Sequence, residues 1–334
     1  MYINGIGIVF NRGRGVAVLR QALSEGWRPP EGGYPRVYRV SDEAIRDRSI
    51  SKDLRRTDRF SRMAAAAAVD AAVDGGLSRG IQGSTGLIVA TGFGPHATTF
   101  KFLDDMLAYR QSEVSPTTFS HSVHNAAASY ISLVLQIHGP TLTLTRFNSA
   151  FYEALLTAQS WLAEKKVSYV LVGAVDECGP VFEHIAGRKL TMSGEGRIKP
   201  FAFSPSAEAV PGEGAVFFLL SAEQAAGYPG IADFSGNGME TSADSNVLAA
   251  DGFIGDETAY KRFAAGPAMS FAALFGTMPG QLAFSLAAGA VIVKTRLVPH
   301  PDFTHGEYES GCRRSVDCIA LGCRGDVRRI RISF

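Results

Sequence analysis

Two segments of this chain are apolar over the full length of a β-strand, and they constrain the fold more than any other feature. Residues 167–173 are almost entirely β-formers, and residues 215–220 are apolar at every position. A strand that is apolar on both faces must be covered on both faces, which is typical of central strands in a sheet flanked by helices. We therefore expect an α/β fold built on a covered, largely parallel sheet.

The rest of the chain alternates between strand-like and helix-like patterns. The patterns predict further strands at residues 2–9, 85–90, 141–145, 231–238, 315–321 and 327–334. They predict helices at residues 16–24, 63–73, 125–136, 149–164 and 284–295, the last of which is buried. Residues 231–238 resemble the opening strand of the chain. We therefore place a boundary there, between an N-terminal half, residues 1–228, and a shorter C-terminal half, residues 229–334.

Composition excludes several classes of function. Of the 334 residues, 46% are hydrophobic and only 19% are charged, which excludes a disordered chain or a coiled coil and favours a large permanent interface. The net charge of +1 provides no cationic field, so we expect no nucleic-acid partner. The longest apolar stretch, residues 284–293, is shorter than the roughly 18 residues that span a bilayer. We expect no membrane segment, no secretory signal and a cytoplasmic location.

The four cysteines do not suggest a metal centre. Cys178, Cys312, Cys318 and Cys323 form no C-x-x-C pair, and no histidine completes a zinc pattern near the last three. We interpret them as reduced thiols, and we expect neither a metal nor another cofactor.

Several motifs occur in a specific order along the N-terminal half. Asn148 and Ser149 open a predicted helix between GPTLTLT at residues 139–145 and VLVGAVDE at residues 170–177. Other matches are DRF at 58–60, GFG at 92–94, Ser115-Pro116 with Asn125 and Ala128, KPF at 199–201 and GEGA at 212–215. With these motifs, residues 1–220 resemble the β-ketoacyl synthases. The resemblance implies the thiolase fold, a layered αβαβα arrangement of two pseudo-repeats, here with a shortened second half.

The resemblance also implies which catalytic residues to look for. The family uses a cysteine at a helix N-terminus, two histidines and a lysine. The cysteine position holds Asn148, whose amide cannot form a thioester. No histidine lies between Glu213 and Pro299, and alignment back from Pro299 puts Gly276 at the second histidine and Phe271 at the lysine. We therefore expect no catalytic residue of the family's type.

Ser149 and two histidines near these motifs can each be interpreted as a structural or as a catalytic residue. Ser149 is expected to cap its helix, with nucleophilic catalysis as the alternative. His121 and His124 have the i, i+3 spacing of one helix face, and we favour hydrogen bonding at a helix start over catalysis or metal binding. The family's glycine-rich gate is represented by GCRG at residues 322–325, whose arginine suits a closed pocket.

A ketosynthase-like body without ketosynthase chemistry resembles the chain-length factors of type II polyketide and aryl-polyene synthases. This resemblance implies a heterodimer with an active β-ketoacyl synthase, and contact with acyl carrier protein through that complex. The alternatives are an atypical acyltransferase or hydrolase using Ser149 and His124, and a degenerate homodimer that binds an acyl group or a carrier protein.

The resemblance predicts an interface and a tunnel. The strand carrying Thr141, Thr143 and Thr145 is expected to pair antiparallel with its equivalent across a two-fold axis. Bulky side chains of the inactive subunit are expected to close the partner's acyl tunnel. The candidates are Phe100, Phe102, Leu103 and Met106, for which the alternative is ordinary core packing of an amphipathic helix.

Overall fold

The computed structural model describes most of the chain. The described residues are 1–32, 36–46, 50, 52–77, 84–109, 114–147, 149–199, 201–202, 208–224, 227–235, 248–250, 268–305, 315–321 and 327–334. Asn148, the GCRG segment at 322–325, Cys312 and Cys323 lie outside them.

The N-terminal half forms a mixed sheet. Its strands are β1 (Tyr2–Phe10), β3 (Thr85–Thr91), β4 (Thr141–Thr145), β5 (Tyr169–Asp176) and β6 (Gly214–Ser221), in the order β4-β3-β5-β6-β1. Strands β4, β3 and β5 run parallel, whereas β6 is antiparallel to both β5 and β1. A short strand, β2 (Gly13–Arg14), pairs with β1. All the strands expected in this half form within a few residues of their predicted bounds.

The C-terminal half repeats this topology. Its strands are β7 (Gly230–Ser235), β8 (Leu248–Ala250), β9 (Ala268–Met269), β11 (Ser315–Leu321) and β12 (Val327–Ser333), in the order β9-β8-β11-β12-β7. The directions also match, because β9, β8 and β11 are parallel and β12 is antiparallel to β11 and β7. The short β10 (Thr304–His305) adds to β9, and the pair Tyr2–Gly230 joins the two halves. The chain is therefore built from two pseudo-repeats.

The expectation of a largely parallel sheet is wrong. Each half combines parallel and antiparallel pairs, and β6, one of the two most apolar segments, is antiparallel to both neighbours. The physical reason is that a continuously apolar strand indicates only that both of its faces are buried. It does not indicate whether the neighbouring strands run parallel or antiparallel to it.

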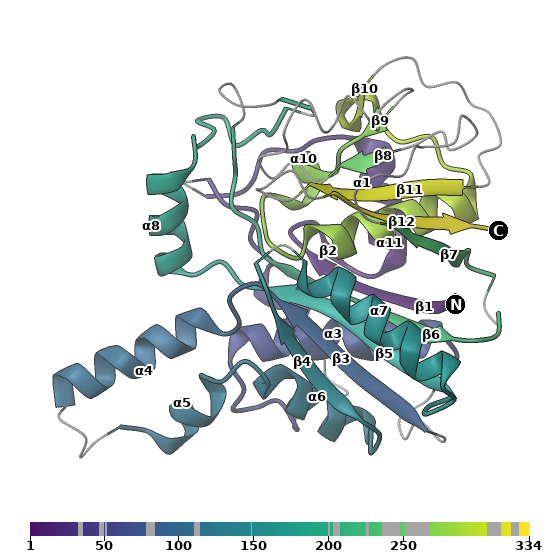
Figure 1. Cartoon of the computed structure of the whole chain (residues 1–334). Helices are drawn as coiled ribbons and strands as arrows, with labels where there is room; N and C mark the ends of the chain where they lie inside the picture. The colour runs from purple at the N-terminus through teal and green to yellow at the C-terminus, as the bar shows by residue number, and fades with distance from the viewer. Residues whose placement is uncertain are drawn as a thin grey trace.

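Helices cover both faces of the first sheet, as Figure 1 shows. Alternate side chains of β5 enter two different cores, with Val170 and Val172 in one and Leu171 and Val175 in the other. The first core contains α1 (Val16–Glu25), α7 (Ala150–Ala163) and α11 (Gln281–Thr295), and α11 also packs on β11 and β12. The second contains α3 (Arg59–Asp74) and α6 (Ala126–Leu135). Helices α7 and α11 thus form a middle layer between the two halves, as the thiolase fold requires.

Helix α3 lies unusually close to β1. A Cβ atom at Gly7 would lie 1.9 Å from the carbonyl oxygen of Ala67, so only glycine fits there. Asp58 caps the helix by accepting a hydrogen bond from Ser61 N at 2.8 Å. The helix consequently starts four residues before its predicted start at Met63.

A helical hairpin projects from one end of the body, away from both termini (Figure 1). It consists of α4 (His96–Tyr109) and α5 (Pro116–His121), which contact each other. The remaining helices in the described residues are α2 (Asp42–Ile45), α8 (Pro180–Lys189), α10 (Ala272–Phe275) and the 3-10 turn η1 (Pro301–Phe303).

Candidate functional site

The N-terminal ends of α7 and α11 meet at a buried carboxyl group. Asp176, at the end of β5, accepts hydrogen bonds from Gly92 N at 2.8 Å, Thr91 Oγ1 at 3.1 Å and Gly280 N at 2.7 Å. Gly280 is the residue before α11, so Asp176 links that helix to the loop after β3. Burial raises the pKa of Asp176 to about 6, although all of these donors favour the carboxylate.

Phe147, which precedes the predicted nucleophile position Asn148 in sequence, lies near this junction. A Cβ atom at Gly92 would lie 2.4 Å from Pro279 Cβ and 3.3 Å from Phe147 O, so Gly92 is close to both Phe147 and the segment that leads into α11. The Phe147 ring also contacts the Phe93 ring, with the centroids 5.5 Å apart. Phe147, the last described residue before Asn148, is therefore close to the segments that precede α4 and α11.

Ser149 occupies the N-cap position of α7, as expected, but its side chain does not cap the helix. Its side chain makes no capping hydrogen bond within the described part of the chain, and its Oγ instead donates to Glu153 Oε1 at 3.2 Å. Glu153 is also paired with Arg146 at 2.5 Å and with Arg328 at 3.6 Å. An acidic residue one turn along the helix competes for the hydroxyl, because residues four apart lie on the same face.

Phe271 and Gly276 occupy apolar surroundings. Phe271 is fully buried, with its ring centroid 6.1 Å from that of Phe303 and 6.5 Å from that of Phe275. Gly276 ends α10 at a φ of 84°, where a Cβ atom would press on Gly212. Neither position offers a polar side chain for catalysis. Their correspondence to the family's lysine and histidine stays a prediction.

His121 and His124 do not share a helix face. His121 is the last residue of α5 and its Nε2 lies 2.6 Å from the Tyr130 hydroxyl, a structural hydrogen bond to α6. His124 lies beyond the helix end, where its ring packs on Gly94. The i, i+3 spacing predicts a shared face only inside a continuous helix, and α5 ends between the two residues.

A buried pair at the base of the hairpin was not predicted. Glu177 follows β5, and its Oε1 accepts from Ala97 N at 2.8 Å in the first turn of α4. His96 Nε2 accepts from Gly179 N at 3.2 Å, while its Nδ1 lies 3.8 Å from Glu177 Oε1. Burial raises the pKa of Glu177 to about 8 and lowers the pKa of His96. The sequence signal for this pair was Asp176-Glu177 directly after an apolar strand.

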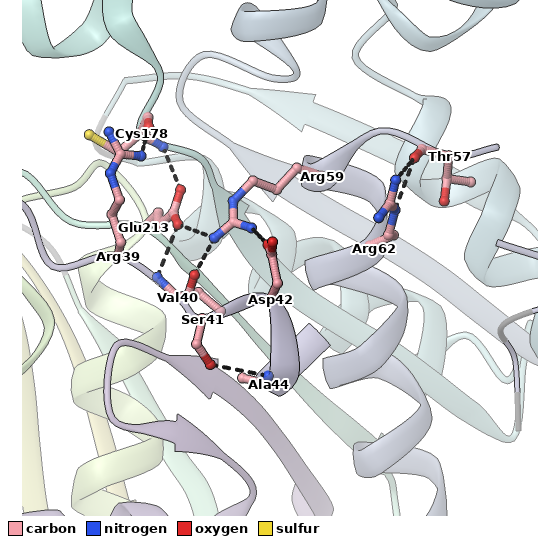
Figure 2. A network of polar contacts seen from close by, with 10 residues as sticks. All are labelled: Arg39, Val40, Ser41, Asp42, Ala44, Thr57, Arg59, Arg62, Cys178 and Glu213. Carbon is pink, nitrogen blue, oxygen red and sulfur yellow. Dashed lines mark hydrogen bonds and ion pairs between the residues drawn. The ribbon is translucent and has the colours of Figure 1, made fainter. Parts of the chain in front are cut away.

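The polar network of Figure 2 joins two of the sequence motifs. Glu213 is buried, and its Oε1 accepts from Arg59 Nη2 at 2.6 Å and from Val40 N at 3.0 Å. Its Oε2 accepts from Cys178 N at 3.1 Å. The DRF and GEGA motifs, more than 150 residues apart in sequence, therefore meet in one ion pair. Burial raises the pKa of the Cys178 thiol, so this cysteine is not an activated nucleophile.

The four tunnel candidates lie on α4, and three of them are exposed. Phe100 is 42% exposed, Leu103 44% and Met106 37%, and Phe102 is half-buried against the Phe119 ring at 5.3 Å between centroids. Ordinary core packing within this chain is therefore excluded for Phe100, Leu103 and Met106.

The predicted interface strand is a sheet edge. Within the described residues β4 pairs only with β3, and its side chains, including Thr141, Thr143 and Thr145, are exposed or half-buried. Helix α6 packs beside β4.

Within the described ranges, the residues near the start of α7 include the aromatic Phe93 and Phe147, the hydrogen-bonded Asp176 and the Ser149–Glu153 pair. Those ranges also contain no cluster of metal-ligating side chains and no helix long and apolar enough to cross a membrane.

Comparison with known proteins identifies the family. The model of the β-ketoacyl synthase N-terminal domain matches residues 42–226, more than half of the chain. The chain therefore belongs to the β-ketoacyl synthase family. No curated protein matches it.

Solved structures share the fold over nearly the whole chain. The ishigamide ketosynthase/chain length factor matches with a TM-score of 0.79 at 14% identity, covering 99% of this chain and 98% of its own. A β-ketoacyl synthase from Burkholderia phymatum matches with a TM-score of 0.80 at 16% identity and the same coverage. A type II polyketide synthase acyl-carrier protein in complex with its ketosynthase, bound to the hexaketide, gives 0.76 at 15%, again over 99% and 98%. At these identities the likeness establishes the thiolase-like fold.

Proposed function

We propose that this chain is a non-catalytic, ketosynthase-like subunit, a chain-length factor, that pairs with an active β-ketoacyl synthase. It shapes the acyl tunnel of that partner in polyketide, polyene or fatty-acid-type biosynthesis. Asn148 at the nucleophile position supports a non-catalytic role, because an amide cannot carry a thioester. The pairing of a ketosynthase with a chain length factor in one similar structure, and with an acyl-carrier protein in another, supports the partners.

The observation that carries this proposal is a set of exposed apolar side chains, which we call the apolar face, together with the open edge of β4. The apolar face consists of large side chains on α4, α5 and α6 that are each more than a third exposed, namely Phe100, Leu103, Met106, Leu107, Phe119 and Leu133. Many exposed large apolar side chains, together with an open sheet edge, are a hazard for a monomer and are typical of a permanent interface. We expect the complex to bury well above about 2,000 Å² in total.

The alternative enzyme receives less support. Ser149 Oγ is bonded to Glu153, a carboxylate that two arginines engage, and His124 packs on Gly94. A serine nucleophile needs a base in hydrogen-bond reach, and a carboxylate held by cations is a poor one.

Co-expression with a cysteine-containing ketosynthase encoded nearby tests the proposal. We expect a heterodimer by light scattering, and condensing activity that needs both chains. Leu133→Glu places a charge in the apolar face and is expected to reduce pairing at least tenfold, because an unpaired charge is costly to bury. Val73→Glu is the matched control, since Val73 is 66% exposed on α3, outside this face. A monodisperse monomer with and without the partner would refute the proposal.

A further inference from the structure

The ring of His96 joins the base of the projecting hairpin to the start of α8. His96 is the first residue of α4, and its Nε2 accepts a hydrogen bond from the N–H of Gly179, the N-cap residue of α8, at 3.2 Å. His96 is only 8% exposed, and its ring centroid lies 6.2 Å from those of both Phe93 and Phe182. One buried nitrogen atom therefore helps to fix the start of α4 against α8.

This contact requires a neutral His96 ring. A neutral histidine that accepts a hydrogen bond at Nε2 carries its ring proton on Nδ1, whereas a protonated ring donates at both nitrogens. Protonation therefore sets the Nε2–H group against the Gly179 N–H group, donor against donor. Within the described residues Nδ1 has no hydrogen-bond partner, and Glu177 Oε1, at 3.8 Å, is beyond hydrogen-bond distance. No hydrogen bond within those residues therefore compensates for the loss of the contact with Gly179.

The surroundings of His96 also oppose a positive charge. The ring lies where the N-terminal ends of α4 and α8 meet, and each of these helix ends carries a partial positive charge. Burial lowers the pKa of His96 and outweighs the attraction of the Glu213 carboxylate. The contribution of the neutral ring to stability is therefore fully present above the ordinary pKa of 6.5, and it is lost as the pH falls through the lowered value.

Several other titratable and charged groups belong to the segments packed around His96. They are Asp176 with Gly92 N, Glu177 with Ala97 N, Glu213 with Arg59, Glu183 with Arg39, Asp58 with Ser61 N, His121 with the Tyr130 hydroxyl, the Cys178 thiol and His124. All of them are retained when His96 alone is substituted. A comparison of His96 variants over a pH range therefore isolates the titration of this one ring.

We propose that His96 is a pH-sensitive latch for the α4–α5 hairpin. The neutral ring holds the start of α4 against α8, and the protonated ring loses its contact with Gly179 and releases the hairpin. The hairpin carries every residue of the apolar face except Leu133, so acidification is expected to weaken pairing with the ketosynthase. That consequence rests on the proposed function, whereas the latch itself rests on the contacts of His96.

Hydrogen exchange of the free full-length chain at pH 7.5 and pH 5.5, corrected for the intrinsic exchange rates, tests the latch. We expect the protection of the α4 amides to fall about 5- to 10-fold at the lower pH. The upper limit is about 10-fold, because one histidine with an ordinary pKa of 6.5 gives this change when it binds its proton only in the released state.

Two substitutions of His96 separate the acceptor atom from the proton. His96→Gln keeps an oxygen that can accept from Gly179 N and cannot be protonated, so the protection of α4 is expected to be the same at both pH values. His96→Phe keeps a ring beside Phe93 and Phe182 but has no acceptor, so low protection is expected at both. His184→Gln is the matched control, because His184 is an exposed histidine on α8, and this variant is expected to keep the pH dependence of wild type.

Two results would overturn the inference. They are equal protection of α4 in wild type at the two pH values, and a pH dependence of His96→Gln that equals that of wild type. Light scattering of the chain co-expressed with the ketosynthase separates this inference from the proposed function. Pairing without any pH-dependent change in the protection of α4 refutes the latch alone, and a pH-dependent hairpin in a chain that never pairs refutes the proposed function alone.

Discussion

At the scale of single residues, three buried carboxyl groups lie close together, and each is stabilised by different neighbours. Glu213 faces the Arg59 guanidinium, and Asp176 receives two backbone N–H groups and a hydroxyl. Glu177 accepts one hydrogen bond, from Ala97 N, and its other close polar neighbour is the neutral His96 ring. Glu177 is consequently the carboxyl group whose charge is least compensated, which explains why burial raises its pKa to about 8.

The raised pKa of Glu177 predicts a pH-dependent stability. The folded chain holds this proton more tightly than the unfolded chain does, so the contribution of Glu177 is fully present below its ordinary pKa of 4.5. It is lost as the pH rises to about 8. Glu177→Gln keeps an oxygen for Ala97 N and cannot ionise. We expect the variant to gain on the order of 3 kcal/mol relative to wild type between pH 5 and pH 8.5.

Urea unfolding at the two pH values measures this gain. Asp176, whose pKa is raised to about 6, and His96, whose pKa is lowered, are present in both chains. The difference between variant and wild type at each pH therefore measures the contribution of Glu177 to stability. A difference between variant and wild type that does not change with pH would show that Glu177 is ionised in the folded chain.

At the residue scale, the sequence identified motifs but not the contacts that their residues make. The DRF and GEGA motifs were recognisable, but a motif does not state its partner, so the Arg59–Glu213 ion pair required the fold. His96 and Glu177 become notable only through burial and unpaired atoms, which residue type alone does not encode. Asn148, by contrast, was identified by its position in a motif and is informative without any coordinates.

At the scale of elements, periodicity placed most strands and long helices, but not their neighbours. β6 is apolar at almost every position, like a parallel strand, yet it runs antiparallel to β1 and β5. Similarly, the helical spacing of Phe100 and Leu103 indicates an apolar face on α4 but not what covers it. That face is exposed in this chain, because α4 belongs to the projecting hairpin.

The exposed face of α4 predicts an effect on the partner's product. If a side chain of α4 closes the acyl tunnel of the paired ketosynthase, its replacement by alanine lengthens the product by about one or two ketide units. We expect Phe100→Ala, Leu103→Ala or Met106→Ala to do this with little loss of stability, because these side chains are more than a third exposed in the free chain. Phe102→Ala also removes a ring contact with Phe119 and is expected to cost about 1 kcal/mol or more.

Product mass from the reconstituted pair, recorded beside the thermal unfolding of each variant, checks this prediction. Val73→Ala is a suitable control, since Val73 is 66% exposed on α3 and lies outside the apolar face. Unchanged product length in all four candidate variants would exclude α4 from tunnel closure.

At the scale of the whole molecule, the two pseudo-repeats meet through α7 and α11, and Asp176 links the starts of both helices through its hydrogen bonds and the adjacent loop. We keep the boundary between residues 228 and 229 as a proposal; it falls between β6 and β7. Because the topology is duplicated, both halves contribute residues to the candidate site around Asp176. Restoring one residue of the first half therefore leaves the contribution of the second half unchanged.

Asn148→Cys tests this division of the chemistry. A thiol before α7 gains from the positive end of the helix dipole, so slow acylation by an acyl thioester is expected. Condensation also needs groups that stabilise the enolate formed on decarboxylation, and the predicted histidine and lysine positions hold Gly276 and the buried Phe271. We expect mass spectrometry to detect acyl-enzyme in the variant but not in wild type, and product assays to detect no condensation by the variant alone. Condensing activity of this single variant without a partner would show that the second half retains a catalytic base and that the alignment to Gly276 and Phe271 is wrong.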